Sequence, residues 1–195
     1  TKNSLRYKML LHICYFVLHG LLLSTEKGNY LLSTFLNDQS MATLFEKFVL
    51  EFYRYHHPSL QASASKISWN TDDDASVFLP SMQTDITLTN EEATLIIDTK
   101  YYSSTLQNRQ DYDIMKFHSN NMYQIYAYVK NKDVNHTGKV SGMLLYAKTD
   151  EEITPSDTLQ VDGNRFFVRT LDLNTDFSKL SAQLDAIVED WLREE

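Results

Sequence analysis

Apolar side chains recur every three or four residues in several segments of the chain, and this spacing places them on one face of a helix. The pattern predicts helices over residues 4–23, 41–55, 111–130 and 176–192. The first segment holds an apolar run too short to span a membrane, so a buried helix is the better interpretation. The last segment is expected to pack its apolar face against the core. That face consists of Phe177, Leu180, Leu184, Ile187, Val188 and Trp191.

Strands are predicted where apolar residues alternate with polar ones or form short buried runs. Residues 82–89 and 93–101 are expected to form a hairpin, and Leu95-Ile96-Ile97 is typical of a strand buried on both faces. Residues 103–110 are predicted as a polar loop. The element order predicts an α/β layered domain with a central mixed sheet flanked by helices. Further strands are expected at residues 63–69, 139–147, 158–161 and 165–173, the last two joined across Asp162-Gly163.

Composition bounds the domain organisation. The 195 residues suit a single domain, and 43% hydrophobic residues suit a globular one. We expect residues 1–40 to be a helical N-terminal extension, 41–175 a core and 176–195 a C-terminal helix. Because the sequence begins at Thr1 rather than Met, it is predicted to be a fragment of a longer chain. The single cysteine, Cys14, excludes an intrachain disulfide and a cysteine zinc site, which favours a cytoplasmic location.

Three charged side chains are expected to meet near the end of the predicted hairpin. Successive side chains of a strand point to opposite faces, so Asp98 and Lys100 share one face. If residues 91–92 form a two-residue turn, the register places Asp85 directly opposite Asp98. Directly paired residues have Cβ atoms about 5 Å apart. Two carboxylates and one ammonium group are therefore predicted to converge.

This combination of side chains suits a divalent cation. Neighbouring carboxylates repel each other, and burying them is unfavourable unless a cation is present. Mg²⁺ prefers oxygen ligands, retains several waters and bridges to phosphate oxygens. Lys100 beside such an ion would hold an attacking water or neutralise charge that develops on the phosphorane. The pattern thus predicts metal-assisted hydrolysis of a phosphodiester.

A structural interpretation of the same residues stays open. An Asp-x-Lys sequence occurs in many proteins, and an exposed ion pair on a strand contributes little. Asp85 at hairpin spacing, and the buried run that leads into Asp98, favour a catalytic site. Glu46 lies in an otherwise aromatic helical stretch, where it either borders the apolar stripe or points toward a metal. Gln124 and Tyr128 are four residues apart and share a helix face.

Taken in chain order, these residues resemble the motifs of the PD-(D/E)xK nuclease superfamily, and the Gln-x-x-x-Tyr helix resembles its RecB-like branch. Three stretches resemble the McrC family, the nuclease subunits of the McrBC modification-dependent restriction system. They are PSMQTDI at residues 80–86, IIDTKYY at 96–102 and NMYQIYAY at 121–128. Thr84 stands where the superfamily name has proline, and Asp98 replaces the commoner glutamate; neither change removes a ligand.

The resemblance implies a restriction-endonuclease-like core forming a single nuclease domain over residues 1–195, and a set of roles. Gln124 and Tyr128 would support the site or contact DNA, and Arg109, near the catalytic strand, is a further candidate for phosphate contact. The metal would be Mg²⁺, for which Mn²⁺ may substitute. The implied metal ligands are Asp85, Asp98, the backbone carbonyl of Thr99 and, in addition, Glu46, with Lys100 as the catalytic lysine.

The family's partners follow from the same resemblance. The substrate would be double-stranded DNA, and the partner an AAA+ GTPase motor of the McrB type that recognises methylated cytosine. GTP would be used by that motor and not by this chain. The motor would contact an N-terminal region that is missing from this sequence. No membrane is expected to be involved.

A net charge of −8 opposes strong DNA binding by this chain alone, because nucleic-acid binders usually carry a basic surplus. If a motor subunit binds the DNA, this chain does not need a basic surplus of its own. Two alternatives remain at this point: a RecB-like repair or recombination nuclease, and an inactive nuclease fold that serves as a docking module.

Overall fold

The computed structural model describes residues 38–72, 78–101, 106–109, 114–148 and 154–193. The predicted helix over residues 4–23 and most of the predicted N-terminal extension lie outside these residues. Within the described residues, no helix is both long enough and apolar enough to cross a membrane.

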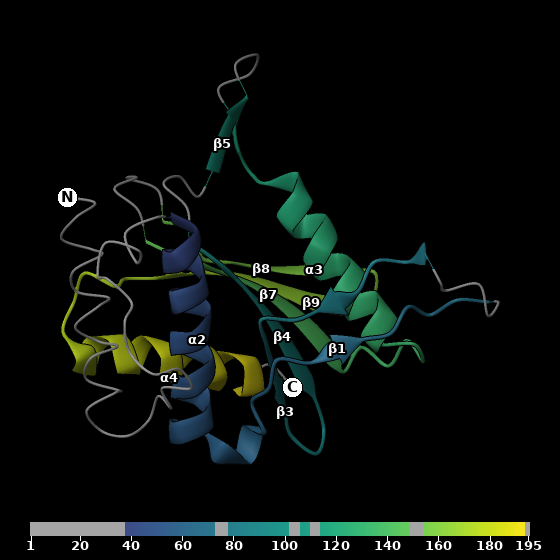
Figure 1. Cartoon of the computed structure of the whole chain (residues 1–195), viewed down its shortest axis with the longest axis horizontal. Helices are drawn as coiled ribbons and strands as arrows, with labels where there is room; N and C mark the ends of the chain where they lie inside the picture. Colours follow the sequence, from purple (N-terminus) through teal and green to yellow (C-terminus); the bar gives the residue numbers. More distant parts are fainter. Residues whose placement is uncertain (1–37, 73–77, 102–105, 110–113, 149–153, 194–195) are drawn as a thin grey trace.

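A five-stranded mixed sheet forms the centre of the fold, as the sequence predicted (Figure 1). Its strand order is β3-β4-β7-β9-β8. The three central strands are parallel and the two edge strands are antiparallel to their neighbours. All eight residues of β7 are buried, as expected for a strand covered on both faces. The strand bounds are β3 Ile86–Thr89, β4 Thr94–Lys100, β7 Val140–Ala147, β8 Asp157–Val161 and β9 Asn164–Leu171.

In the described part of the chain, α-helices cover the sheet in two layers (Figure 1). Helices α2 (Asp38–His56) and α4 (Phe177–Arg193) contribute to one apolar cluster, and α3 (Ser119–Lys132) contributes to a second. Alternation along β4 divides its side chains between the clusters. Leu95 and Ile97 lie in the first cluster, and Ile96 lies in the second. The predicted layered α/β core is therefore confirmed.

Helix α3 approaches β7 closely because β7 carries a glycine at the contact. A Cβ atom at Gly142 would lie 2.8 Å from a side-chain carbon of Ile125 and 2.9 Å from one of Val129. Any larger residue would push the helix away from the sheet. Since α3 also carries the predicted Gln124, Gly142 helps to set the height of that side chain above the sheet.

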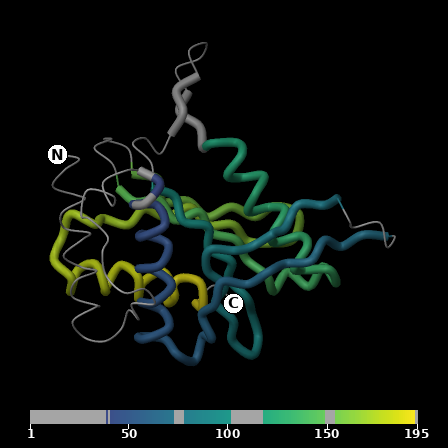
Figure 2. Tube along the Cα trace, in the orientation of Figure 1, coloured from purple at the N-terminus to yellow at the C-terminus, as the bar shows by residue number. Residues whose placement is uncertain are grey.

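Two small antiparallel sheets extend from this core. One pairs β1 (Lys66–Ile67) with β2 (Met82–Gln83), and Figure 2 shows these two segments side by side next to α3. The other pairs β5 (Leu106–Arg109) with β6 (Ile114–Phe117). The predicted strand over residues 63–69 is thus shorter than expected, although Ser63 adds an isolated bridge to Thr87.

The β5–β6 hairpin contradicts two predictions. The expected polar loop over residues 103–110 contains β5, and the expected helix over residues 111–130 begins only at Ser119. In between, β6 is held by pairing with β5, for example Leu106 opposite Phe117. Strand pairing is a contact between separate segments, so it overrides a helical pattern that is read from one segment alone.

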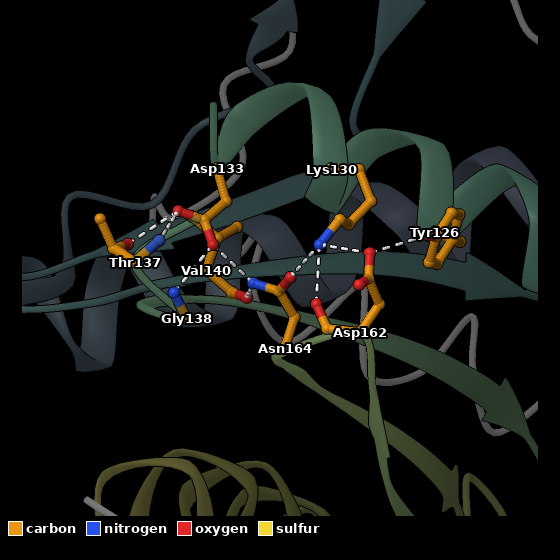
Figure 3. A network of polar contacts seen from close by, with 8 residues as sticks. All are labelled: Tyr126, Lys130, Asp133, Thr137, Gly138, Val140, Asp162 and Asn164. Atoms are coloured by element: carbon orange, nitrogen blue, oxygen red, sulfur yellow. Dashed lines mark hydrogen bonds and ion pairs between the residues drawn. The ribbon is translucent and has the colours of Figure 1, made fainter. Parts of the chain in front are cut away.

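A network of polar contacts joins the end of α3 to the sheet (Figure 3). Asp133 is 3% exposed and follows α3 directly. Its carboxylate accepts four hydrogen bonds, two from Thr137, one from the Gly138 amide and one from Asn164. The network continues through Asn164 to Lys130, which also pairs with Asp162 in the β8–β9 turn.

The β8–β9 turn matches the prediction of a hairpin across Asp162-Gly163. Val161 pairs with Asn164, so the loop has two residues. Both loop residues have positive φ, 48° at Asp162 and 82° at Gly163, as this kind of tight hairpin turn requires. The turn thereby positions the Asp162 carbonyl and carboxylate beside Lys130 of α3.

Candidate active site

Asp98 and Lys100 lie on the same face of β4, toward α3, as strand alternation predicted. Asp98 is buried, with 1% of its surface exposed. Lys100 Nζ lies 2.7 Å from Asp98 Oδ2 and forms an ion pair with it. The two residues lie at the end of β4, where the strand changes from buried to half-buried.

Asp85 lies immediately before β3, at the position that the hairpin register predicted. Ile86 pairs with Ile97, so the same register places Asp85 opposite Asp98. The Asp85 side chain turns toward the next residue of β4. Its Oδ2 atom accepts a hydrogen bond of 2.7 Å from the Thr99 amide and one of 2.8 Å from the Thr99 hydroxyl.

Glu46 joins this group from helix α2. Burial raises the pKa of the Glu46 carboxyl, and the neighbouring Asp85 carboxylate raises it further. Glu46 in turn contributes to the electrostatics of Asp98. Glu46 is therefore electrostatically coupled to the other carboxylates, and its role as a metal ligand stays a prediction.

Burial raises the pKa of Asp98 to about 6. Lys100 lowers it, but the nearby charges of Asp85 and Glu46 act in the opposite direction. The Asp98 carboxylate is therefore paired with one ammonium group and is within electrostatic reach of two further carboxylates, those of Asp85 and Glu46, which are only half-buried. The region around Asp98 is short of positive charge at neutral pH.

The donor set fits a divalent cation of the Mg²⁺ type. Carboxylate oxygens are the ligands that such an ion prefers, and a cation would relieve the repulsion that raises the Asp98 pKa. In the described part of the chain, no three His, Cys, Asp or Glu side chains are close enough together to hold an ion by themselves. A bound ion would therefore need backbone oxygens or waters as well, and Mg²⁺ commonly retains waters.

Helix α3 supplies a row of polar side chains to the same region. Gln124 Oε1 accepts a hydrogen bond of 3.1 Å from Lys100 Nζ, and Gln124 Nε2 donates one of 3.1 Å to the Tyr128 hydroxyl. Sequence reasoning placed Gln124 and Tyr128 on one face but missed a third member, Asn121. Its side-chain amide donates to the hydroxyl of Tyr146, which pairs with Lys100 across β4 and β7. Helical spacing between Asn121, Gln124 and Tyr128 was the available signal.

If the site performs the metal-assisted DNA hydrolysis that the sequence predicts, Gln124→Leu is expected to reduce DNA cleavage by about ten- to a hundredfold, the usual effect of losing a group that orients a metal-site residue. The variant removes the acceptor for Lys100 Nζ and leaves the ammonium group less firmly placed. Steady-state cleavage rates of the assembled complex would measure this. Tyr128→Phe is the matched comparison, because it keeps the contact between Gln124 and Lys100 and should lose less activity. Equal losses in both variants would contradict the assigned role of Gln124.

Arg109 lies in β5, and the structure does not describe its side chain. Its contact with DNA stays a prediction, as does the metal-ligand role of the Thr99 carbonyl.

The fold and the site together define a class of protein. This is a layered α/β domain of the restriction-endonuclease-like kind, in which carboxylates and a lysine meet at the end of a central strand. The chain belongs to the family of McrBC 5-methylcytosine restriction system components, whose model matches residues 1–147. The family resemblance drawn from the sequence motifs is thereby confirmed.

A curated relative supports the same conclusion. The chain is 29% identical over 196 residues to the type IV methyl-directed restriction enzyme EcoKMcrBC of Escherichia coli (strain K12). The match covers 98% of this chain and 55% of the relative. The chain therefore spans about half the length of the curated relative that it matches.

Proposed function

We propose that this chain is the Mg²⁺-dependent nuclease part of a methylcytosine-directed restriction complex, in which it hydrolyses phosphodiester bonds of DNA. The observation that carries the proposal is the site itself. A nearly fully buried aspartate with a raised pKa lies among two further carboxylates and beside one lysine. Such an arrangement is unfavourable for folding, and perturbed carboxylates of this kind cluster at functional sites.

The site residues have two proposed roles. The carboxylates bind the cation, and Lys100 acts on the reacting phosphate. Asp85 and Asp98, with the Thr99 carbonyl and waters, would hold the ion, and Glu46 would be an additional ligand. The bound ion would supply Lewis-acid stabilisation of the phosphate and lower the pKa of a coordinated water. Mn²⁺ is expected to substitute, since it accepts the same oxygen ligands.

Lys100 is placed to act on the reacting phosphate. Its ammonium group is held by Asp98 on one side and by Gln124 on the other. A cation fixed in this way can orient an attacking water or neutralise charge that builds up on the phosphate. Because the lysine side chain is only 13% exposed, little solvent screens that charge.

The net negative charge of the chain supports a role for a partner that binds the DNA. A net charge of −8 disfavours independent binding to DNA. We therefore propose that a GTP-driven motor of the McrB type grips double-stranded DNA and presents it to this domain. GTP would be hydrolysed by the motor and not by this chain.

The decisive experiment compares cleavage of methylated and unmethylated DNA by the full protein with its motor, GTP and Mg²⁺. We expect cleavage of methylated DNA only, lost on chelation and restored by Mn²⁺. Lys100→Met is expected to reduce cleavage at least about a hundredfold, by analogy with loss of one preorganised charge-stabilising group. Lys179→Met, on the exposed surface of α4, is the matched control and should retain activity.

The possible outcomes separate the alternatives. Cleavage that ignores methylation and needs no motor would favour a repair or recombination nuclease. Full restriction activity in Lys100→Met would indicate a docking module and overturn the proposal.

A further inference from the structure

The side chain of Thr99 contacts the site in a way that the metal-ligand pattern does not anticipate. Both hydrogen bonds that the structure gives to the Asp85 carboxylate come from Thr99, one from its amide and one from its hydroxyl. Both end on the same oxygen, Oδ2. A single residue of β4 therefore fixes one end of the Asp85 carboxylate.

The local backbone explains why this contact forms. Strand β3 begins at Ile86, so Asp85 lies just outside the ladder that joins β3 to β4. Its carboxylate takes the place of a backbone acceptor and satisfies the Thr99 amide, which would otherwise lack a partner at the sheet edge. The hydroxyl of Thr99 adds a second donor to the same oxygen.

A second anchor holds the residue that precedes Asp85. Thr84 is 2% exposed, and its hydroxyl contacts the Thr87 hydroxyl at 2.9 Å and the Ser65 amide at 3.0 Å. The Thr84 amide also donates to the Ser65 carbonyl. These bonds fix the backbone at a position where the superfamily pattern has a proline, so Asp85 is constrained through its main chain as well as through Oδ2.

The other carboxylate oxygen is left for a different contact. Among the described residues, Asp85 Oδ1 makes no hydrogen bond, and it is not one of the buried polar atoms that lack partners. Asp85 itself is half-buried. One oxygen is thus fixed by the protein, while the other remains accessible beside β4, where Asp98 lies opposite in the strand register.

We propose that Thr99 is a positioning residue whose hydroxyl fixes Oδ2 of Asp85, so that Oδ1 is presented as a single-oxygen ligand to a divalent cation. This inference rests on the proposed function and adds a role for the Thr99 side chain to the role expected of its carbonyl. Outer partners that orient metal ligands commonly affect metal affinity by about ten- to a hundredfold. Loss of the hydroxyl leaves only the Thr99 amide to hold Oδ2, so the carboxylate is less firmly oriented and cation binding is weakened without removal of a ligand.

The test uses Thr99→Val, which keeps the shape of the side chain but removes the hydroxyl, and Thr99→Ser, which restores a hydroxyl. Mn²⁺ binding to the full protein is measured calorimetrically without DNA, and the Mg²⁺ concentration for half-maximal cleavage is measured in the assembled complex. We expect Thr99→Val to weaken Mn²⁺ binding and to raise the half-maximal Mg²⁺ concentration by about tenfold or more. Saturating Mg²⁺ should recover much of the cleavage rate, the KM for DNA should change little, and Thr99→Ser should return both values toward those of the wild type.

Thr94→Val is the matched control, because Thr94 lies at the opposite end of β4 and is buried. It should leave Mn²⁺ affinity unchanged. If the wild type binds Mn²⁺ and Thr99→Val binds it equally well, the positioning role is overturned while the proposed function stands. If the wild type binds no Mn²⁺ and shows no metal-dependent cleavage, the proposed function itself fails. A Thr99→Val chain that loses only thermal stability, with unchanged cation affinity, would assign Thr99 a structural role and also overturn the inference.

Discussion

Asp98→Asn is expected to abolish DNA cleavage and, at the same time, to stabilise the folded protein. The substitution keeps the size of the side chain and removes its negative charge. In the proposed function a bound cation would supply several kcal/mol of transition-state stabilisation, so losing Asp98, the most buried of its proposed ligands, should reduce the rate by about a thousandfold or more. Cleavage by the assembled complex at saturating Mg²⁺ measures the loss.

The gain in stability follows from the environment of Asp98. Its pKa is raised from 3.8 to about 6, mainly by burial, so the fold disfavours the ionised form. A rise of this size corresponds to roughly 3 kcal/mol at most at pH 7 in the absence of divalent cations. Asparagine carries no charge and avoids this penalty. We therefore expect Asp98→Asn to raise the free energy of unfolding, measured with urea in the presence of a chelator.

The raised pKa of Asp98 also determines how the stability difference between variant and wild type changes with pH. Between about pH 4 and 6 the folded state binds more protons at Asp98 than the unfolded state does, so wild-type stability decreases as the pH rises through this range. The difference between Asp98→Asn and wild type should therefore be largest above pH 6 and vanish near pH 4. Asp157→Asn, at an exposed site on β8, is the control for removal of a surface charge and should change the free energy of unfolding little. An Asp98→Asn chain that is less stable than wild type at pH 7 would contradict the assigned environment.

The second large effect is expected on stability, and it concerns Asp133, which lies outside the candidate active site. Asp133→Ala removes the acceptor of four hydrogen bonds and leaves donors of Thr137, Gly138 and Asn164 without it (Figure 3). Leaving a buried donor without its acceptor destabilises the fold by about 1–3 kcal/mol for each group that stays unsatisfied. We expect a loss of this size in the free energy of unfolding, measured by urea denaturation.

The pKa of Asp133 supports this expectation. Burial alone would raise it, but the hydrogen bonds from Thr137, Asn164 and Gly138 outweigh burial and lower the pKa to about 2. Because the folded pKa lies below the unfolded one, the stabilisation is present above about pH 4 and is lost as the pH falls toward 2. The difference between wild type and Asp133→Ala should shrink over the same range.

Asp162→Ala is the matched control within the same network. The Asp162 side chain is 62% exposed and bonds to Lys130 and Tyr126 at the surface, where solvent screens the ion pair. Its loss should change stability far less than that of Asp133. Similar losses in the two variants would show that the buried position of Asp133 is not what matters.

The destabilisation at Asp133 also has a consequence for the site. The network fixes the C-terminal end of α3 to β7 and to the β8–β9 turn, and α3 carries Gln124. In Asp133→Ala that remains folded under stabilising conditions, we therefore expect a reduced cleavage rate through a displaced Gln124. The effect on rate should be smaller than that of Gln124→Leu.

Much of the fold and part of the site follow from the sequence because they depend on short-range rules. Alternation along β4 places Asp98 and Lys100 on one face, and a two-residue turn fixes the register that brings Asp85 opposite Asp98. The Asp162-Gly163 hairpin is determined in the same way, since a tight turn of this kind needs residues that tolerate positive φ. In each case the relevant contacts lie within one hairpin, so the chain itself carries the full information.

Tertiary structure decided the features that depend on separate segments. The β5–β6 hairpin replaces part of a predicted helix, because pairing between two short strands outweighs a weak helical pattern. Glu46 reaches the carboxylates only through the packing of α2, and Asn121 reaches Tyr146 only because Gly142 admits α3 so close to β7. The direction of the Asp85 carboxylate toward Thr99 depends on where β3 begins. Such contacts join residues that are distant in the sequence, and the periodicity within one segment does not predict them.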